Sequence, residues 1–318
     1  MKRIFTYLSF IFLLVEVSRA QQDAQYSQYM FNQLVINPAY AGSRDVLNSV
    51  IDLRKQWVSL PGAPQTGSFS LHGPIPSLNI GLGGHLVTET IGPSKWTAAA
   101  FDFAYHFRLG KGKLSLGLSA GAINYNLNLT QNNYENAGEV IPSQNLGPRT
   151  RFDMSTGFYY YTKTFYIGGA ATHVNGPNLY NDVYQIPSTI TGAPKSSTLF
   201  FSLRPHVFLY AGKGFSINQN LIINPSIMLK TDNFNGSGSM DLNCNFLIHQ
   251  KLWLGLSARL GYGVVALFQF NITDKLRIGY SYDQSLGRLS ALGQSSHEIM
   301  LGYNFSINKP KMVSPRYL

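Results

Sequence analysis

The sequence predicts an all-β protein, a transmembrane antiparallel β-barrel of about 14 strands with a non-barrel arm or plug at its N-terminus. Three features predict this class: apolar and polar side chains that alternate every two residues, an export signal, and connections that alternate in length. Residues 251–260, KLWLGLSARL, show the alternation best. Four leucines and an alanine share one parity, and tryptophan, glycine, serine and arginine share the other. A strand here is therefore apolar on one face.

Residues 1–20 have the features of a signal peptide. Lys2 and Arg3 form the positive start, residues 4–15 form the apolar run, and Ser18-Arg19-Ala20 is a small-x-small cleavage site. The alternative is a single membrane anchor, but such a span needs about 20 apolar residues and this run has roughly a dozen. No apolar stretch of spanning length follows it. The sequence therefore predicts export without a transmembrane helix.

The composition also favours a barrel over a water-soluble domain. Only 13% of residues are charged, against about 25% in soluble proteins, and 13% are aromatic. A mean hydropathy of −0.05 is compatible with a barrel because only the outward half of each strand must be apolar. The single cysteine, Cys244, excludes an internal disulfide. The net charge of +10 is dispersed, which together with the export signal argues against nucleic-acid binding.

The pattern divides the chain into a signal peptide (1–20), an arm or plug (21–45), a barrel (46–307) and a periplasmic tail (308–318). The expected strands are 47–55, 67–73, 79–87, 96–109, 113–129, 151–161, 164–175, 198–212, 221–231, 237–249, 252–260, 264–272, 275–283 and 297–307.

Short joins at 74–76, 110–112, 163, 212–220, 249–251 and 273–275 alternate with longer ones at 56–65, 88–95, 130–150, 176–197 and 284–296. The join at 261–263 is short although it falls on the long-loop side. Bacterial barrels have short periplasmic turns and longer outer loops. An even strand count therefore places both mature termini in the periplasm.

Charged and polar residues concentrate on the inward parity of the expected strands. A charge that faces lipid at mid-depth costs about 2–4 kcal/mol, so their confinement to one parity supports the register. We interpret them as filling and cross-linking the lumen through ion pairs and hydrogen bonds; the alternative is an ion or substrate path. They are His85, Asp102, His106, Asp153, Arg204, His206, Asp241, Asn243, Arg259, Arg277, Asp283 and Glu298.

The sequence contains no recognisable catalytic motif. It has no G-x-S-x-G elbow, no H-E-x-x-H pair and no Walker loop. The glycine-rich run 81–84 lies inside an expected strand, where small residues relieve crowding rather than cradle phosphate. The seven histidines are scattered without metal-ligand spacing. We therefore predict no enzyme activity, no cofactor and no metal site.

The arm carries a long motif. Residues 22–32, QDAQYSQYMFN, run into residues 36–42, INPAYAG. Three further pieces follow in order: RKQW with PGAPQT (54–66), NIGLGG with IGP (79–93), and YSYD with SHEI (280–299). Together they resemble the PorP/SprF family, the outer-membrane proteins of the type IX secretion system and gliding motility in Bacteroidetes. The motif positions in the arm are Tyr26, Tyr29, Phe31, Asn37, Pro38, Tyr40 and Gly42. We expect these aromatics to pack as a fixed element in the periplasmic mouth.

The resemblance implies a role in secretion and surface attachment, without chemistry of its own. Its expected partners are outer-membrane lipid, type IX components and a secreted adhesin with a type-B C-terminal domain. The long connections offer exposed aromatics and prolines, residue types that can anchor a protein partner. These are Trp57, Pro61, Tyr134, Tyr180 and Tyr184. The alternative function is a plugged transport barrel for small or hydrophobic solutes.

Overall fold

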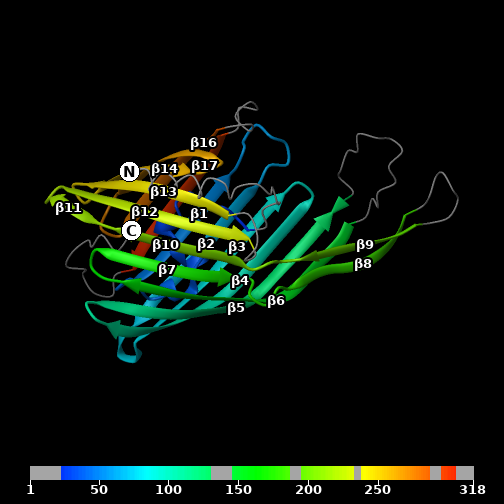
Figure 1. Ribbon diagram of the computed structural model, residues 1–318, viewed down its shortest axis with the longest axis horizontal. Helices are drawn as coiled ribbons and strands as arrows, with labels where there is room; N and C mark the ends of the chain where they lie inside the picture. Colours follow the sequence, from blue (N-terminus) through cyan, green and yellow to red (C-terminus); the bar gives the residue numbers. More distant parts are fainter. Residues whose placement is uncertain (1–22, 130–144, 187–194, 233–237, 287–294, 306–318) are drawn as a thin grey trace, which may run out of the picture.

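The computed structural model describes residues 23–129, 145–186, 195–232, 238–286 and 295–305. Within these residues, 14 antiparallel strands close into a barrel, as the sequence predicts (Figure 1). The ring closes where β1 pairs with β17, from Leu47 opposite Phe305 to Lys55 opposite His297. Its first half consists of β1 (Leu47–Lys55), β2 (Gln65–Ile75), β3 (Ile80–Ile91), β4 (Ser94–Leu109), β5 (Gly112–Asn128), β6 (Asn145–Tyr161) and β7 (Phe165–Thr172). Its second half consists of β10 (His206–Lys213), β12 (Leu221–Asp232), β13 (Gly238–Ile248), β14 (Leu252–Arg259), β15 (Gly263–Asn271), β16 (Leu276–Ser285) and β17 (Ser295–Phe305).

Three further described strands, β8, β9 and β11, are not among the 14 strands of the ring. β11 (Phe215–Asn218) continues β10 along the same partner, β12. β8 (Asn178–Ile186) and β9 (Lys195–Ser202) form a separate hairpin that leaves the ring between β7 and β10 and projects away from it (Figure 1).

The expected strand 198–212 is therefore wrong as a single element. It divides into the end of β9 and the start of β10. Pro205 lies in the break, where the absence of a backbone N–H prevents a continuous ladder.

The alternation of side chains follows the predicted parity. On β14, Leu254 and Leu256 are exposed whereas Trp253 and Arg259 are buried. The same alternation runs along β1, β2, β15 and β16. The barrel thus has an apolar outer surface and a lumen lined by polar and aromatic side chains, which is the arrangement that a bilayer requires.

Connections at the two ends of the barrel differ in length. One end, the short-turn end, carries tight joins such as β4–β5 and β6–β7, and there β1 begins and β17 ends. The opposite, long-loop end carries the β1–β2 and β16–β17 connections and the β8–β9 hairpin. The expected long join at 88–95 is wrong, because β3 and β4 extend to Ile91 and Ser94 and leave a two-residue turn.

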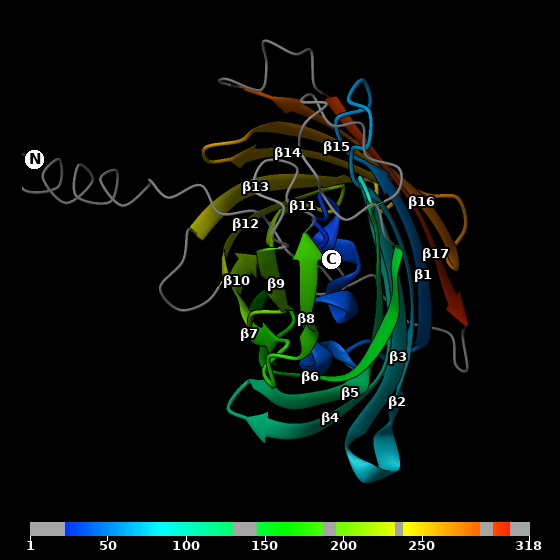
Figure 2. The same ribbon diagram turned by 90° about the vertical axis from the view of Figure 1, so that its right-hand side faces the viewer.

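The arm lies inside the barrel. Figure 2 shows its short helices within the ring of strands. They are the 3-10 turns η1 (Tyr29–Phe31), η2 (Gln33–Val35) and η3 (Pro38–Tyr40); a fourth, η4 (Pro76–Leu78), joins β2 to β3. No described helix is long and apolar enough to cross a membrane.

The arm also extends further than the expected position in the periplasmic mouth. The arm is joined to the start of β1 at the short-turn end. From there it extends through the lumen to side chains near the long-loop ends of β1, β16 and β17. The reason is that the lumenal carboxylates and arginines which bind its backbone lie at that depth.

Candidate functional site: the plugged lumen and the long-loop rim

The last turn of the arm is shaped by Asn37 and Pro38. The Asn37 side chain accepts a hydrogen bond from the Ala39 N–H at 2.9 Å, and Pro38 occupies the first helical position, where no N–H is needed. The Asn37 amide also donates to the Phe158 carbonyl oxygen at 2.9 Å and to the Tyr210 hydroxyl at 3.0 Å. One residue therefore caps η3 and fastens it to β6 and β10.

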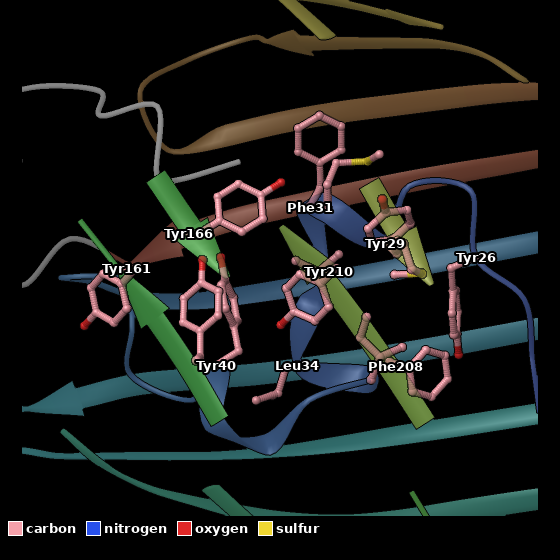
Figure 3. Close-up of a cluster of buried hydrophobic side chains, with 14 of the residues drawn as sticks. Tyr26, Tyr29, Phe31, Leu34, Tyr40, Tyr161, Tyr166, Phe208 and Tyr210 are labelled. Carbon is pink, nitrogen blue, oxygen red and sulfur yellow. The ribbon is translucent and has the colours of Figure 1, made fainter. Parts of the chain in front are cut away.

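Aromatic side chains fill the lumen around η3. The Tyr40 ring lies 5.3 Å from that of Tyr159 and 5.2 Å from that of His72, both edge-on. Figure 3 shows Tyr40 of the arm among Tyr161, Tyr166 and Tyr210 of the wall. Such edge-to-face contacts contribute about 0.5–1.5 kcal/mol each beyond the area that they bury.

The end of the arm runs along the wall at backbone contact distance. Gly42 has a φ of +67°, a region that favours glycine, and its N–H donates to Nδ1 of His72 at 3.1 Å. A Cβ at Gly81 would collide with the Ala41 carbonyl oxygen. Gly42 of the arm and Gly81 of the wall therefore allow the two backbones to approach each other closely.

A buried ionic cluster holds the start of the arm. The N–H groups of Ser27 and Gln28 each donate to the Glu298 carboxylate at 2.7 Å. Arg54 binds Glu298 at 2.9 Å and Asp283 at 2.7 Å, and the side chains of all three are fully buried. The Ser27 hydroxyl donates to Asp283 at 2.7 Å. Two carboxylates, one guanidinium and the arm backbone therefore form one connected network, in which Nε of Arg54 and Oδ1 of Asp283 have no hydrogen-bond partner among the described residues.

A second pair fastens the arm to β13 and β14. Nε of Arg259 lies 3.1 Å from both carboxylate oxygens of Asp241. The other guanidinium nitrogens donate to the Gln25 side chain at 3.1 Å and to the Tyr26 carbonyl oxygen at 3.4 Å. The guanidinium also lies 3.8 Å from Asp283, which links this pair to the first cluster.

A histidine after β7 bridges the arm and the wall. Nε2 of His173 lies 2.8 Å from Asp23 and Nδ1 lies 2.9 Å from Asp153 of β6. Burial disfavours the imidazolium, but the two carboxylates outweigh it and raise the pKa of His173 to about 10. Burial likewise opposes ionisation of Asp23, yet His206 and His173 hold the pKa of Asp23 well below its usual range. The contact is therefore a charged bridge at neutral pH.

The four candidate lumenal residues do not form one group. Arg259, Asp283 and Glu298 meet in the connected clusters near the long-loop end. Arg277 lies toward the short-turn end, opposite Gly302 in the register, and its Nε and Nη2 atoms have no hydrogen-bond partner among the described residues.

Sequence reasoning missed the part played by Ser27 and Gln28. These residues bind through backbone N–H groups as well as side chains, and no side-chain pattern reveals that. Arg54 belongs to the family motif, and its inward parity on β1 could have identified it as a lumenal residue.

The long-loop rim presents part of the β1–β2 connection. Pro61 is exposed, as are Val58 at 42% and Leu60 at 41%. Trp57 is half-buried, has a φ of +43°, and its N–H donates to the Ser296 hydroxyl at 3.2 Å. The exposed apolar surface here thus comes from the neighbours of Trp57.

The expectation that Tyr180 is an exposed contact residue is wrong. Its side chain is 1% exposed, and its hydroxyl donates to the Gly147 carbonyl oxygen at 2.8 Å. It belongs to a second cluster of buried apolar residues, with Val87, Trp96, Ile123, Tyr125, Leu179 and Leu203. The base of the β8–β9 hairpin therefore packs into the long-loop end of the lumen. Tyr184 lies in β8, and Tyr134 lies outside the described residues.

Comparisons with known proteins agree with this architecture. The family model for the type IX secretion system membrane protein PorP/SprF matches residues 18–303. No curated protein matches the chain. Among solved structures, the Ralstonia pickettii toluene transporter TbuX has 11% identity and a TM-score of 0.54, with 87% of this chain and 94% of that chain covered. The CymD monoaromatic hydrocarbon channel has 12% identity and a TM-score of 0.51, with 89% and 94% covered.

At such low identity these structures show a shared fold. The family match spans nearly the whole barrel and the arm motif, and it therefore shows the family as well as the fold. This chain belongs to the PorP/SprF family of type IX secretion system membrane proteins, and is a β-barrel of the outer membrane that associates with type IX secretion components.

Proposed function

We propose that this barrel is a plugged, non-enzymatic scaffold of the type IX secretion system. It docks the secretion machinery at its periplasmic, short-turn end and a secreted surface adhesin with a type-B C-terminal domain at its outer rim, for export, surface attachment or gliding motility. The observation that carries the proposal is the arm, which is fastened inside the lumen by buried ion pairs and hydrogen bonds. A folded cargo domain would therefore bind the surfaces at the two ends.

The outer rim has features of a protein-binding surface. The β1–β2 loop exposes Val58, Leu60 and Pro61 and is held in shape by its own backbone. Gln56 N–H donates to the Pro64 carbonyl oxygen at 2.9 Å, and Gly92 N–H of the next turn donates to that of Gly62 at 2.8 Å. Preordered apolar side chains bind partners at a low entropic cost.

The periplasmic end has a different exposed element. On β11, Phe215 is 45% and Ile217 is 59% exposed, and residues two apart in a strand face the same side. Figure 1 shows β11 at the far end of the barrel, away from the β8–β9 hairpin. Two large apolar side chains exposed on one face of this short strand support a contact with another protein.

The test removes each surface in turn. The double variant Val58→Ser/Leu60→Ser is expected to release the adhesin into the medium while other type IX cargo is still exported. Phe215→Ser/Ile217→Ser is expected to reduce co-purification of machinery components. Leu78→Ser is the matched control, since Leu78 is 59% exposed at the short-turn end but lies on η4. Full adhesin retention in the rim variant would contradict the docking role of this loop.

The second candidate is a plugged transport barrel for small or hydrophobic solutes. The specific observation that favours it is incomplete filling of the lumen, since cavities of about 60 and 210 Å³ flank the arm. A deletion strain that keeps its full set of surface adhesins but fails to take up a hydrophobic solute would establish transport over docking.

A further inference from the structure

Of the two cavities that flank the arm, the larger lies between the start of the arm and the inner faces of β10, β12 and β13. It has a volume of about 210 Å³. Ile36 of the arm, Phe208 of β10 and Met228 of β12 form its apolar side, with the rings of Tyr26 and Tyr29. An apolar cavity of about 150 Å³ is enough to hold benzene. The space therefore accommodates one aromatic ring or a short aliphatic chain together with a polar group.

The polar side of the cavity is set by strand register. Phe208, Lys230 and Ser239 stand opposite one another across β10, β12 and β13, in one inward-facing row. His206 is in the next row toward the long-loop end. The Ser239 hydroxyl and Nε2 of His206 have no hydrogen-bond partner among the described residues. Buried polar atoms are rarely left unpaired, so these two atoms point to a missing partner.

The charges around the cavity favour an anion. The Lys230 ammonium lies 3.4 Å from the Gln25 side-chain oxygen and 3.8 Å from Asp241, so neither contact is a close ion pair. Asp241 is already bound twice by Arg259. The other carboxylate at the cavity, Asp23, is bound by His173 and Thr172 and lies 3.5 Å from Nδ1 of His206. Both carboxylates thus have cationic partners other than Lys230, whereas the Lys230 ammonium, with three donors, has capacity left.

We propose that this cavity binds a small amphipathic monocarboxylate, either an aromatic acid or a short-chain aliphatic one. Its carboxylate lies against Lys230 and Ser239 with His206 at the edge, and its apolar body packs on Met228, Phe208 and Ile36. Because the arm supplies part of the lining, a bound acid also ties the arm to β12. This inference is independent of the docking role.

The test uses the full-length mature protein in detergent micelles, with benzoate as the probe and isothermal titration calorimetry as the readout. We expect saturable binding to the wild type. Lys230→Met keeps the length of the side chain without its charge and is expected to weaken binding by at least about tenfold, because it removes a charge-assisted hydrogen bond. Lys230→Arg keeps the charge and is expected to retain binding. Lys251→Met, at an exposed turn on the short-turn end, is the matched control.

Benzyl alcohol, an uncharged probe of similar size, separates the carboxylate from the ring. We expect it to bind much more weakly than benzoate to the wild type and equally weakly to Lys230→Met. Tight benzyl alcohol binding would replace the proposal with an apolar-solute site. Absence of saturable benzoate binding, or unchanged binding in a Lys230→Met variant that still migrates as a folded barrel, would overturn it.

Discussion

The contacts that hold the arm are buried charges, each matched by an opposite charge or by backbone N–H groups. Glu298 accepts from Ser27, Gln28 and Arg54, and Asp283 accepts from Ser27 and Arg54. In a low-dielectric interior such groups are costly alone and stable together. Loss of any one of these partners therefore weakens the attachment of the plug, in addition to which the arm buries a large apolar area.

Glu298→Gln removes the charge but keeps the shape of the side chain. Loss of one partner from a buried ion pair costs about 3–5 kcal/mol, and the remaining amide oxygen offsets part of this. We expect faster chymotrypsin cleavage at the arm aromatics Tyr26 and Tyr29, and heat unfolding at a lower temperature. Glu89→Gln is the control, because Glu89 is buried but bonds to Thr66 and Trp96 of the wall. Equal cleavage rates in the two variants would show that Glu298 does not fasten the arm.

The His173 bridge gives the plug a defined pH dependence. Folding raises the pKa of His173 from 6.5 to about 10, so its contribution is complete below pH 6.5 and is lost as the pH rises through about 10. The pKa of Asp23 is lowered, so its contribution is present above its ordinary value of 3.8 and is lost as the pH falls below that.

In thermal unfolding, the difference in Tm between wild type and His173→Gln should be largest near pH 5–6.5 and shrink toward pH 10. The neutral glutamine cannot form the charged bridge at any pH. A difference that stays constant across this range would mean that His173 contributes only shape and hydrogen bonds.

At the scale of elements, the wall of the barrel is uneven. β5 and β6 have 17 residues each, whereas β7 and β10 have 8 each. The chain between β7 and β10 forms the β8–β9 hairpin, whose base inserts apolar side chains over the inner faces of β3, β4 and β5. A hairpin of two strands is marginal by itself, so this buried base decides its position.

Leu179→Asp should detach the hairpin while the barrel stays closed. Leu179 is fully buried, and an unpaired carboxylate in its place costs several kcal/mol. Amide hydrogen exchange in β8 and β9 should become faster, with β4 and β5 remaining protected. Ile217→Asp, at a position 59% exposed on β11, should leave the hairpin unchanged. Protection of β8 in the Leu179 variant would show that pairing with β9 alone holds it.

At the scale of the whole molecule, the hydrogen-bonded ring closes without the plug. The pairing from β1 round to β17 involves no arm residue. Deletion of residues 23–40 should therefore leave a heat-modifiable barrel, but one with a hydrated lumen, because Arg54, Asp283 and Glu298 lose their arm partners.

In planar bilayers the deletion variant should show an ion conductance, and cells that carry it should gain vancomycin sensitivity. The full-length protein should show neither. Permeability that does not change on deletion, in a variant that still folds, would mean that side chains of the wall or the β8–β9 hairpin close the lumen without the arm.

The sequence alone determined the barrel class, the strand count, the inward parity of the charges on the ring strands and the family. These follow from local periods and motifs, because side chains in a strand alternate between two faces, and this alternation can be recognised without knowing which strands lie beside it. Arg204 is an exception to the expected parity, because it lies exposed in the break between β9 and β10. The expected strand 198–212, which is two elements, carried a local signal in Pro205, where the ladder breaks; β8 and β11 lie in segments that were expected to be connections.

Only the tertiary structure decided what the lumen contains. It placed Ser27 against Glu298 across 271 residues of sequence, buried Tyr180 where a loop suggested exposure, and left a cavity beside Lys230. Such contacts depend on closure of the whole ring, which sets the depth of every inward side chain relative to the arm. A periodic pattern fixes which face a residue occupies, but the partner it meets there depends on how all 14 strands are joined.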